Sequence, residues 1–114
     1  MRRFPFVTLD VFTQRPLEGN QLAVFTDGRG LSDAEMQGLA RETNLSETTF
    51  IIPRDAEIER QNGVKVRIFT VAEELPFAGH PTLGTATLLH RQRGDKEVNL
   101  DLRVGKVPVR FSQR

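Results

Sequence analysis

The sequence predicts an α+β domain in which strands dominate and one buried helix is wrapped by the sheet. Six segments carry the alternation or the β-branched composition of strands, whereas only two have helical spacing. The second of these helices is apolar on almost every side, and such a helix must be buried. A chain of 114 residues fits one domain, so we expect residues 1–114 to share a single core.

The predicted strands are short and are separated by turn residues. They cover residues 6–12, 22–26, 48–52, 64–69, 98–104 and 107–111. In the first of them Val7, Leu9 and Val11 share one face, which is the pattern of a half-buried strand. Residues 54–63 are polar and end in Asn-Gly, so we expect a loop closed by a turn there.

The first helix carries clear start and stop signals. Ser32 and Glu35 match an S-x-x-E capping box, in which each side chain bonds the backbone of the other residue. Gly38 in the helix interior costs about 1 kcal/mol relative to alanine. Asn44 tolerates the left-handed conformation, so we expect the helix to end there.

The second helix is expected to start with Pro81 at its first position, where the missing N–H costs nothing. It should run to Arg93 and end at Gly94. Up to His90 it carries almost only apolar and small residues. Small residues let neighbouring backbones approach closely, which suits a helix enclosed by strands.

The C-terminal stretch predicts a β-hairpin. The Gly-Lys pair at 105–106 has the composition of a two-residue type II′ loop. A turn at this point would pair Leu100 with Phe111 on the apolar face. On the opposite face it would set Asp101 against Arg110, which carry opposite charges.

Composition argues against several functional classes. Sixteen Lys and Arg against fifteen Asp and Glu give a net charge of +1, without the clustered cations of a nucleic-acid-binding surface. The chain has no cysteine, which excludes disulfides, thiolate metal sites and cysteine nucleophiles. No apolar run is long enough for a bilayer span or a signal sequence, so we expect no membrane contact and a cytoplasmic location.

The segment Gly79-His80-Pro81, at the start of the second helix, is the first chemical candidate. The N–H groups of a first helical turn lack partners within the helix and lie at its positive end, which favours a carboxylate or phosphate. Gly79 lets a ligand approach the backbone closely, and His80 places beside it an imidazole, a side chain that can act as an acid or a base. The alternative is a tight turn into the helix that His80 merely caps.

Glu47 is the second candidate, because it lies where the first helix gives way to a strand. Its apolar neighbours Leu45 and Phe50 could desolvate it, which would raise its pKa and suit proton transfer near neutral pH. The alternative is a solvated surface glutamate. The only two histidines, His80 and His90, lie too far apart for metal-ligand spacing, so we predict no metal site.

Three motifs occur in order along the chain. They are DVFTQRPLEGNQLAVF at 10–25, NLSETTF at 44–50, and RIFT at 67–70 with ELPFAGHPTLGTATLL at 74–89. Together they resemble the first half of the PhzF family of phenazine biosynthesis, which has the diaminopimelate-epimerase-like fold. The resemblance runs from residue 4 to at least residue 111. It implies a half-barrel of strands around a central helix, and an isomerase that moves a proton by acid–base chemistry without a cofactor.

The resemblance also implies a role for five residues. Glu47 would transfer the proton, and His80 would assist it. The backbone of Gly79 and His80 would hold a substrate carboxylate, while Asn20 and Ser46 would line the same pocket. The substrate would be a small carboxylate-bearing ring or an amino-acid-like molecule.

Departures from the family pattern leave two hypotheses open. Gln21 and Val71 each stand where the family usually has a proline, and both changes are expected to be tolerated. Family members also carry a second, similar half that faces the first across the active-site cleft. We therefore expect either an isomerase half that works only with a C-terminal half, which is supplied by another chain or lost by truncation, or a non-catalytic module that is truncated or self-associating and binds small molecules. Because the face toward a missing half should be apolar, we expect a homo-oligomer or a complex rather than a monomer.

Overall fold

The computed structural model describes residues 4–11 and 20–111, except for the side chains of residues 10, 11 and 20. Residue 12 of the first predicted strand, and the part of the first motif at 12–19, lie outside this range. Within the described range the chain forms three helices and seven strands. In chain order these are β1 (Phe6–Val11), β2 (Asn20–Phe25), α1 (Asp33–Thr43), β3 (Glu47–Ile52), α2 (Ala56–Asn62), β4 (Val64–Phe69), β5 (Glu74–Leu75), α3 (Gly79–Arg93), β6 (Glu97–Leu102) and β7 (Gly105–Arg110).

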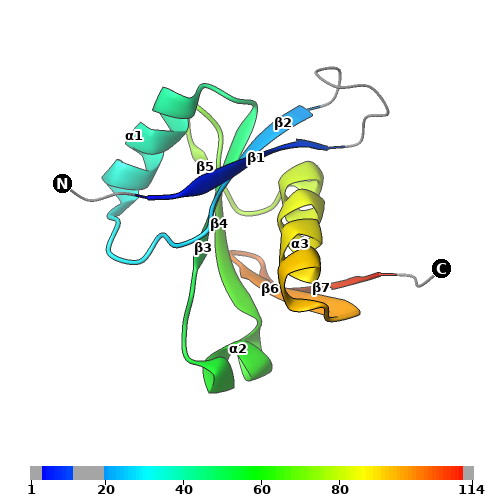
Figure 1. Ribbon diagram of the computed structural model, residues 1–114. Coiled ribbons are helices and arrows are strands. Elements are labelled where there is room, and N and C mark those ends of the chain that lie inside the picture. The colour runs from blue at the N-terminus through cyan, green and yellow to red at the C-terminus, as the bar shows by residue number, and fades with distance from the viewer. Residues whose placement is uncertain (1–3, 12–19, 112–114) are drawn as a thin grey trace.

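The described strands form one mixed sheet that wraps around α3 (Figure 1). Its order is β1-β2-β3-β4-β6-β7, and β5 pairs with β4. β2 runs parallel to β3 and β4 runs parallel to β6, while the other pairs are antiparallel. α3 contacts β1, β2, β3 and β6, which come from both ends of the sheet. The predicted α+β architecture with a central helix is therefore confirmed.

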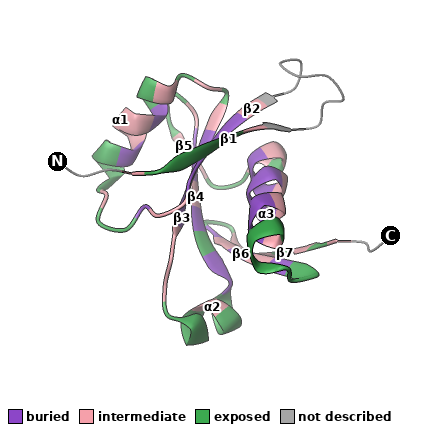
Figure 2. Cartoon of the chain, in the orientation of Figure 1, coloured by how far each residue is buried: buried purple, intermediate pink, exposed green. Residues whose placement is uncertain are grey.

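The face of the sheet toward α3 carries the larger core, which is aliphatic (Figure 2). Its buried residues are Leu22, Val24, Ile51, Val64, Val66, Ile68, Ala86, Leu88, Leu89, Val98, Leu100 and Leu102. α3 itself is buried along most of its length, including positions with small side chains such as Gly84. This burial explains why the sequence of α3 has almost no polar face before His90.

The opposite face of the sheet carries a smaller aromatic core under α1. The rings of Phe25 and Phe50 stack with centroids 4.8 Å apart, and Phe69 meets Phe50 edge-on at 5.4 Å. Met36 and Ala40 of α1 cover these rings. β2 and β3 are therefore buried on both faces, whereas β4 is buried on the α3 face and exposes Lys65 on the other. Close packing holds the buried residues of these strands in fixed places.

α1 begins and ends where the sequence predicts. The Ser32 hydroxyl accepts a hydrogen bond from the Glu35 amide at 3.1 Å, and the Glu35 carboxylate accepts one from the Ser32 amide at 2.8 Å. Asn44 ends the helix in the left-handed conformation, with a φ of 54°. Because both ends are capped, the point at which the chain turns from α1 into β3 is fixed.

The prediction of a loop over residues 54–63 was wrong, because most of this segment is the helix α2. α2 has no buried residue, so it lacks the apolar periodicity from which a helix is predicted. Polar contacts hold it instead. The Arg54 amide donates to the Glu59 carboxylate at 3.0 Å, and the Arg54 guanidinium donates to the Gly63 carbonyl oxygen and to the Asp101 carboxylate, both at 2.9 Å.

The hairpin of β6 and β7 is present, but its predicted register was wrong. The turn lies at residues 103–104, so Leu100 faces Val107 rather than Phe111. The pairs are Glu97–Arg110, Val98–Val109, Asn99–Pro108, Leu100–Val107, Asp101–Lys106 and Leu102–Gly105. Gly105, with a φ of 123°, supplies the positive φ just after the turn instead of inside it. The shift changes each partner by an even number of residues, so the same side chains still face the core.

β5 is a short strand that the sequence did not predict, and an ion pair holds it on β4. Arg67 donates to both carboxylate oxygens of Glu74, from Nε at 2.8 Å and from a terminal nitrogen at 2.7 Å. Asp33 and Arg103 extend this charge network. The hydrogen bonds from Arg67 hold the pKa of Glu74 below its usual value. Because β5 leads into the segment before α3, the pair helps to fix where α3 begins.

We expect Gly63→Ala to destabilise the domain by roughly 2–3 kcal/mol, because Gly63 has a φ of 94° in a region that only glycine occupies easily. An added Cβ would also lie 2.8 Å from the Asn99 carbonyl oxygen of β6. Chemical denaturation measures the effect.

The matched control is Gly38→Ala in α1, where an added Cβ meets nothing within 4 Å among the described residues. This change should stabilise the domain by about 1 kcal/mol through helix propensity. Equal stability of the two variants would contradict the close approach of Gly63 to β6.

Candidate active site

Glu47 is the first residue of β3 and points toward the face of the sheet that α3 covers. Side chains alternate along a strand, so Glu47 shares a face with Thr49 and Ile51. Thr49 bonds a residue of α3, and Ile51 belongs to the aliphatic core around α3. Glu47 itself is half-buried, and its backbone lies beside that of Leu22 in the parallel pair of β2 and β3.

α3 begins at Gly79, two residues earlier than predicted. Ala78 is its N-cap in an extended conformation, and Pro81 is buried at the third helical position rather than the first. Proline is tolerated throughout the first turn, because none of the N–H groups there has an intrahelical acceptor. The backbone amides of Gly79 and His80 are therefore the first two of the helix. The side chain of His80 does not cap it.

The surroundings of Gly79 leave room for a ligand. An added Cβ at Gly79 would meet nothing within 4 Å among the described residues, and the residue is exposed. Packing therefore does not demand a glycine there. A glycine at an exposed helix start keeps the backbone accessible to an anion.

The start of α3 and the Glu47 carboxyl act on each other electrostatically. Burial raises the pKa of Glu47 above its ordinary value, and the nearby charge of His80 partly opposes this rise. The structure thus brings the two principal candidates into one region, at the end of the molecule where β2, β3 and α3 all begin (Figure 1). A carboxyl with a raised pKa beside a histidine and a helix start can accept and return a proton near an anionic substrate.

The two remaining predicted residues lie at the same end of the sheet. Ser46 is exposed in the turn between α1 and β3. Asn20 is the first residue of β2, where its backbone pairs with Val11, and its side chain lies outside the described part of the chain. The parallel pairing of β2 with β3 sets the start of each strand at one edge, near Glu47.

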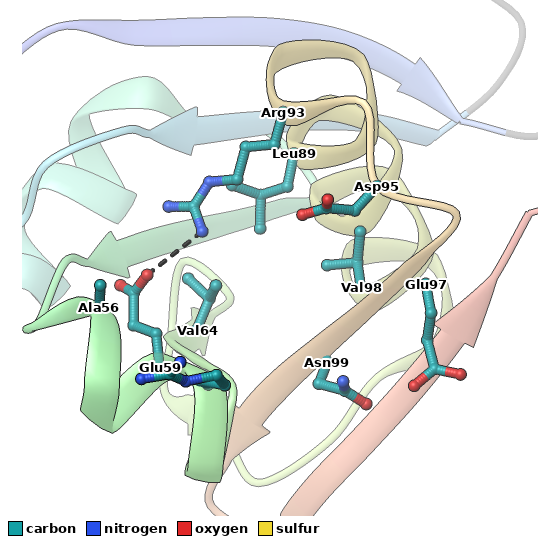
Figure 3. Close-up of a pocket in the computed structure, with 10 residues that line it drawn as sticks. Ala56, Glu59, Val64, Leu89, Arg93, Asp95, Glu97, Val98 and Asn99 are labelled. Carbon is teal, nitrogen blue, oxygen red and sulfur yellow. Dashed lines mark hydrogen bonds and ion pairs between the residues drawn. The ribbon is translucent and has the colours of Figure 1, made fainter.

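A cavity of about 350 Å³ lies at the opposite end of α3, between α2, the C-terminus of α3 and β6 (Figure 3). It is lined by Ala56, Glu59, Arg60, Val64, Leu89, Arg93, Asp95, Glu97, Val98 and Asn99. Arg93 donates to Glu59 at 3.2 Å across this hollow, and Glu59 also accepts from the Arg54 amide. None of the predicted site residues lines it. Its Glu59 carboxylate is already bonded to Arg93 and to the Arg54 amide.

The described residues also lack two further features, a cluster of metal ligands and a membrane-spanning helix. No group of three or more histidine, aspartate or glutamate side chains is close enough to hold a metal ion in that part of the chain. Nor does the described range contain a helix with the length and apolar character to cross a bilayer.

The sequence analysis missed one polar contact beside the site. Thr49 of β3 and Thr85 of α3 share a hydrogen bond of 2.9 Å between their hydroxyls, and both residues are fully buried. The only sequence signal was the presence of threonines in a helix that is otherwise apolar. Threonine is common in strands and tolerated in helices, so that signal does not identify a partner.

Glu47→Gln is expected to raise the stability of the domain at about pH 7 and to leave it unchanged at about pH 3. The folded chain binds a proton at Glu47 more tightly than the unfolded chain does, because burial raises the pKa of this carboxyl. Above the folded pKa, the charged form therefore lowers the free energy of unfolding. This loss vanishes once both states are protonated. Thermal unfolding at the two pH values measures the difference.

Glu74→Gln is the matched control with the opposite sign. The folded pKa of Glu74 is lowered, so its charge stabilises the domain above the unfolded pKa, and the contribution is lost as pH falls through the folded value. This variant should lose stability at neutral pH and approach the parent chain in acid. A stability loss from Glu47→Gln at neutral pH would contradict the burial of Glu47.

Sequence comparison identifies relatives along almost the whole chain. The family model for the PhzC-PhzF "Phenazine biosynthesis-like protein" matches residues 9–114. A trans-2,3-dihydro-3-hydroxyanthranilate isomerase from Pseudomonas aeruginosa is 45% identical over 109 residues, which cover 96% of this chain and 38% of that protein. An uncharacterized isomerase from Mesorhizobium japonicum is 47% identical over 90 residues, covering 79% of this chain and 29% of that protein.

Solved structures show the same relationship. A "Predicted Epimerase" from Pseudomonas aeruginosa superposes with a TM-score of 0.83 at 43% identity, over 97% of this chain and 39% of the other. A PhzF-family phenazine biosynthesis protein from Bacillus anthracis gives 0.82 at 26% identity, over 100% of this chain and 38% of the other. The chain thus spans about two fifths of the length of these relatives. It belongs to the PhzF family of phenazine-biosynthesis-like proteins, of whose fold it forms about one half.

Proposed function

We propose that this chain is one half of a cofactor-independent isomerase that transfers a proton on a small, carboxylate-bearing cyclic or amino-acid-like substrate. The observation that carries the proposal is that the Glu47 carboxyl lies close enough to the start of α3 to feel the charge of His80. Burial raises the pKa of the Glu47 carboxyl, and the charge of His80 acts on it from the first turn of the helix. The name of the Pseudomonas aeruginosa relative supports a dihydro-hydroxyanthranilate as the model substrate.

The chemistry follows from the charges at the two positions. The amides of Gly79 and His80 would receive the substrate carboxylate, because the start of a helix favours an anion. The Glu47 carboxylate would accept a proton from one ring carbon as the C–H bond breaks, and the electron pair would move into the conjugated system. Protonated Glu47 would then return the proton to another carbon, so that no atom or electron is gained or lost. His80 would assist by stabilising charge beside Glu47.

The length of the chain bears on whether it acts alone. It covers 38% of the length of the isomerase that it resembles, so the other wall of the site would come from a C-terminal half. The alternative proposal is a binding module of the same fold, which holds small carboxylates and associates with itself without catalysis.

A ligand titration tests the carboxylate site. The amide NMR signals of Gly79 and His80 should shift in a saturable way when 3-hydroxyanthranilate is added to the labelled chain. The amides of Ser32 and Glu35 at the start of α1 are the internal control, because the capping box of that helix already occupies both of them. Equal shifts at both helix starts, or shifts at neither, would contradict a specific site.

A proton-exchange assay tests catalysis. The chain is mixed with the C-terminal part of the Pseudomonas aeruginosa isomerase, and deuterium uptake from D₂O into a dihydro-hydroxyanthranilate substrate is followed. We expect uptake only in the mixture, and a loss of about a hundredfold or more with Glu47→Gln. Carboxylate binding without exchange in any mixture would overturn the isomerase and leave the binding module.

A further inference from the structure

A single buried hydroxyl pair joins the two elements that carry the proposed site. Thr49 of β3 and Thr85 of α3 share a hydrogen bond of 2.9 Å, and each has 0% of its surface exposed. Thr49 follows Glu47 on the same face of β3, and Thr85 lies in α3, whose first turn contains His80. The bond therefore links the strand of the proposed acid to the helix of the proposed anion site.

Other threonines of α3 use their hydroxyls differently. Thr82 donates to the Ala78 carbonyl oxygen at 2.7 Å, and Thr87 donates to the Leu83 carbonyl oxygen at 2.8 Å. Both are the usual bonds of a helical threonine to its own preceding turn. Thr85 reaches across to the sheet, so its hydroxyl contributes to the packing of α3 rather than only to the helix.

The surroundings make this bond the directional element of the interface. The other contacts between α3 and the sheet are mostly aliphatic, apart from the ring of His90, which stacks on Phe111 after β7 with centroids 4.1 Å apart. Apolar contacts are non-directional, so close packing holds α3 against the sheet without a bond that specifies its place along β3. A buried hydrogen bond has a preferred distance and angle, and is costly to leave unmade. It therefore fixes the position of α3 along β3.

We propose that Thr49 and Thr85 are positioning residues, whose hydrogen bond sets the place of the His80 end of α3 relative to Glu47. The proposal rests on the proposed function for its catalytic consequence, but the placement itself can be measured without any activity. A small displacement of α3 would separate the helix start from Glu47, and misplacement by about 1 Å can cost on the order of a hundredfold in rate.

The decisive variant is the double change Thr49→Val with Thr85→Val. Removing both hydroxyls leaves no unsatisfied polar group, so the domain should keep nearly its parent stability. It should nevertheless lose the fixed position of α3. Thr82→Val is the matched control, because it removes a buried hydroxyl from the same helix without touching the bond to β3. The single change Thr85→Ser should behave like the parent chain, because it keeps the hydroxyl.

The main readout is the titration of the Glu47 carboxyl, followed by ¹³C NMR, together with the amide shifts of Gly79 and His80. In the double variant we expect the pKa of Glu47 to fall toward its ordinary value, because a displaced α3 covers the carboxyl less and lets water reach it. In Thr82→Val and Thr85→Ser it should stay at the parent value. A double variant with parent titration and parent amide shifts would overturn the positioning role, as would a Thr82→Val variant that reproduces its effect.

Activity in the mixture with a C-terminal half is the second readout. The double variant should lose between about ten- and a hundredfold in kcat, with little change in KM. If Glu47→Gln leaves deuterium exchange intact while the double variant still shifts the Glu47 titration, the proposed function fails and the positioning survives. If Glu47→Gln abolishes exchange while the double variant changes neither titration nor kcat, the positioning fails and the proposed function survives.

Discussion

The burial of α3 inside the curved sheet is the constraint on which the rest of the domain depends. The helix contacts β1, β2, β3 and β6, so strands from both ends of the sheet must reach it. This requires the parallel step from β4 to β6, which returns the chain to the sheet after α3 and lets the β6–β7 hairpin close over the helix. Because the helix is packed on several sides, the position of its first turn beside the start of β3 is fixed.

Two glutamates differ in whether their charge stabilises the fold, and the difference marks one of them as a candidate for function. Glu74 lies in a bidentate pair with Arg67, which lowers its pKa, so its charge supports the fold. For Glu47, burial outweighs the nearby charge of His80 and raises the pKa of the carboxyl, so its charge opposes the fold. A residue that destabilises the folded state in its working form is typical of a functional position. The contrast supports a role for Glu47 that the fold alone does not require.

Much of this fold could be predicted from the sequence, and the exceptions have physical reasons. Strands with an alternating core face and the capped helix α1 follow local rules, and both were predicted. α2 was missed because it buries nothing, and β5 because it depends on a pair with Arg67 rather than on its own composition. The hairpin register was misplaced because a glycine can supply a positive φ inside a turn or just after it. The region shared by Glu47 and His80 came from the family resemblance, since neither position has a local pattern that would bring them together.

The openness of the site gives a physical reason why, under the proposed function, a second half would be needed for proton transfer. Gly79 is exposed, and Glu47 is only half-buried, so water reaches both groups in the chain as it stands. Desolvation is the main cause of the raised pKa of Glu47, and a helix start attracts an anion more strongly when water is excluded. A second half that covered this end of the molecule would therefore strengthen both effects by burial alone. Under the proposed function, a second half would thus assist proton transfer by excluding water from the site, independently of any catalytic side chain that it adds.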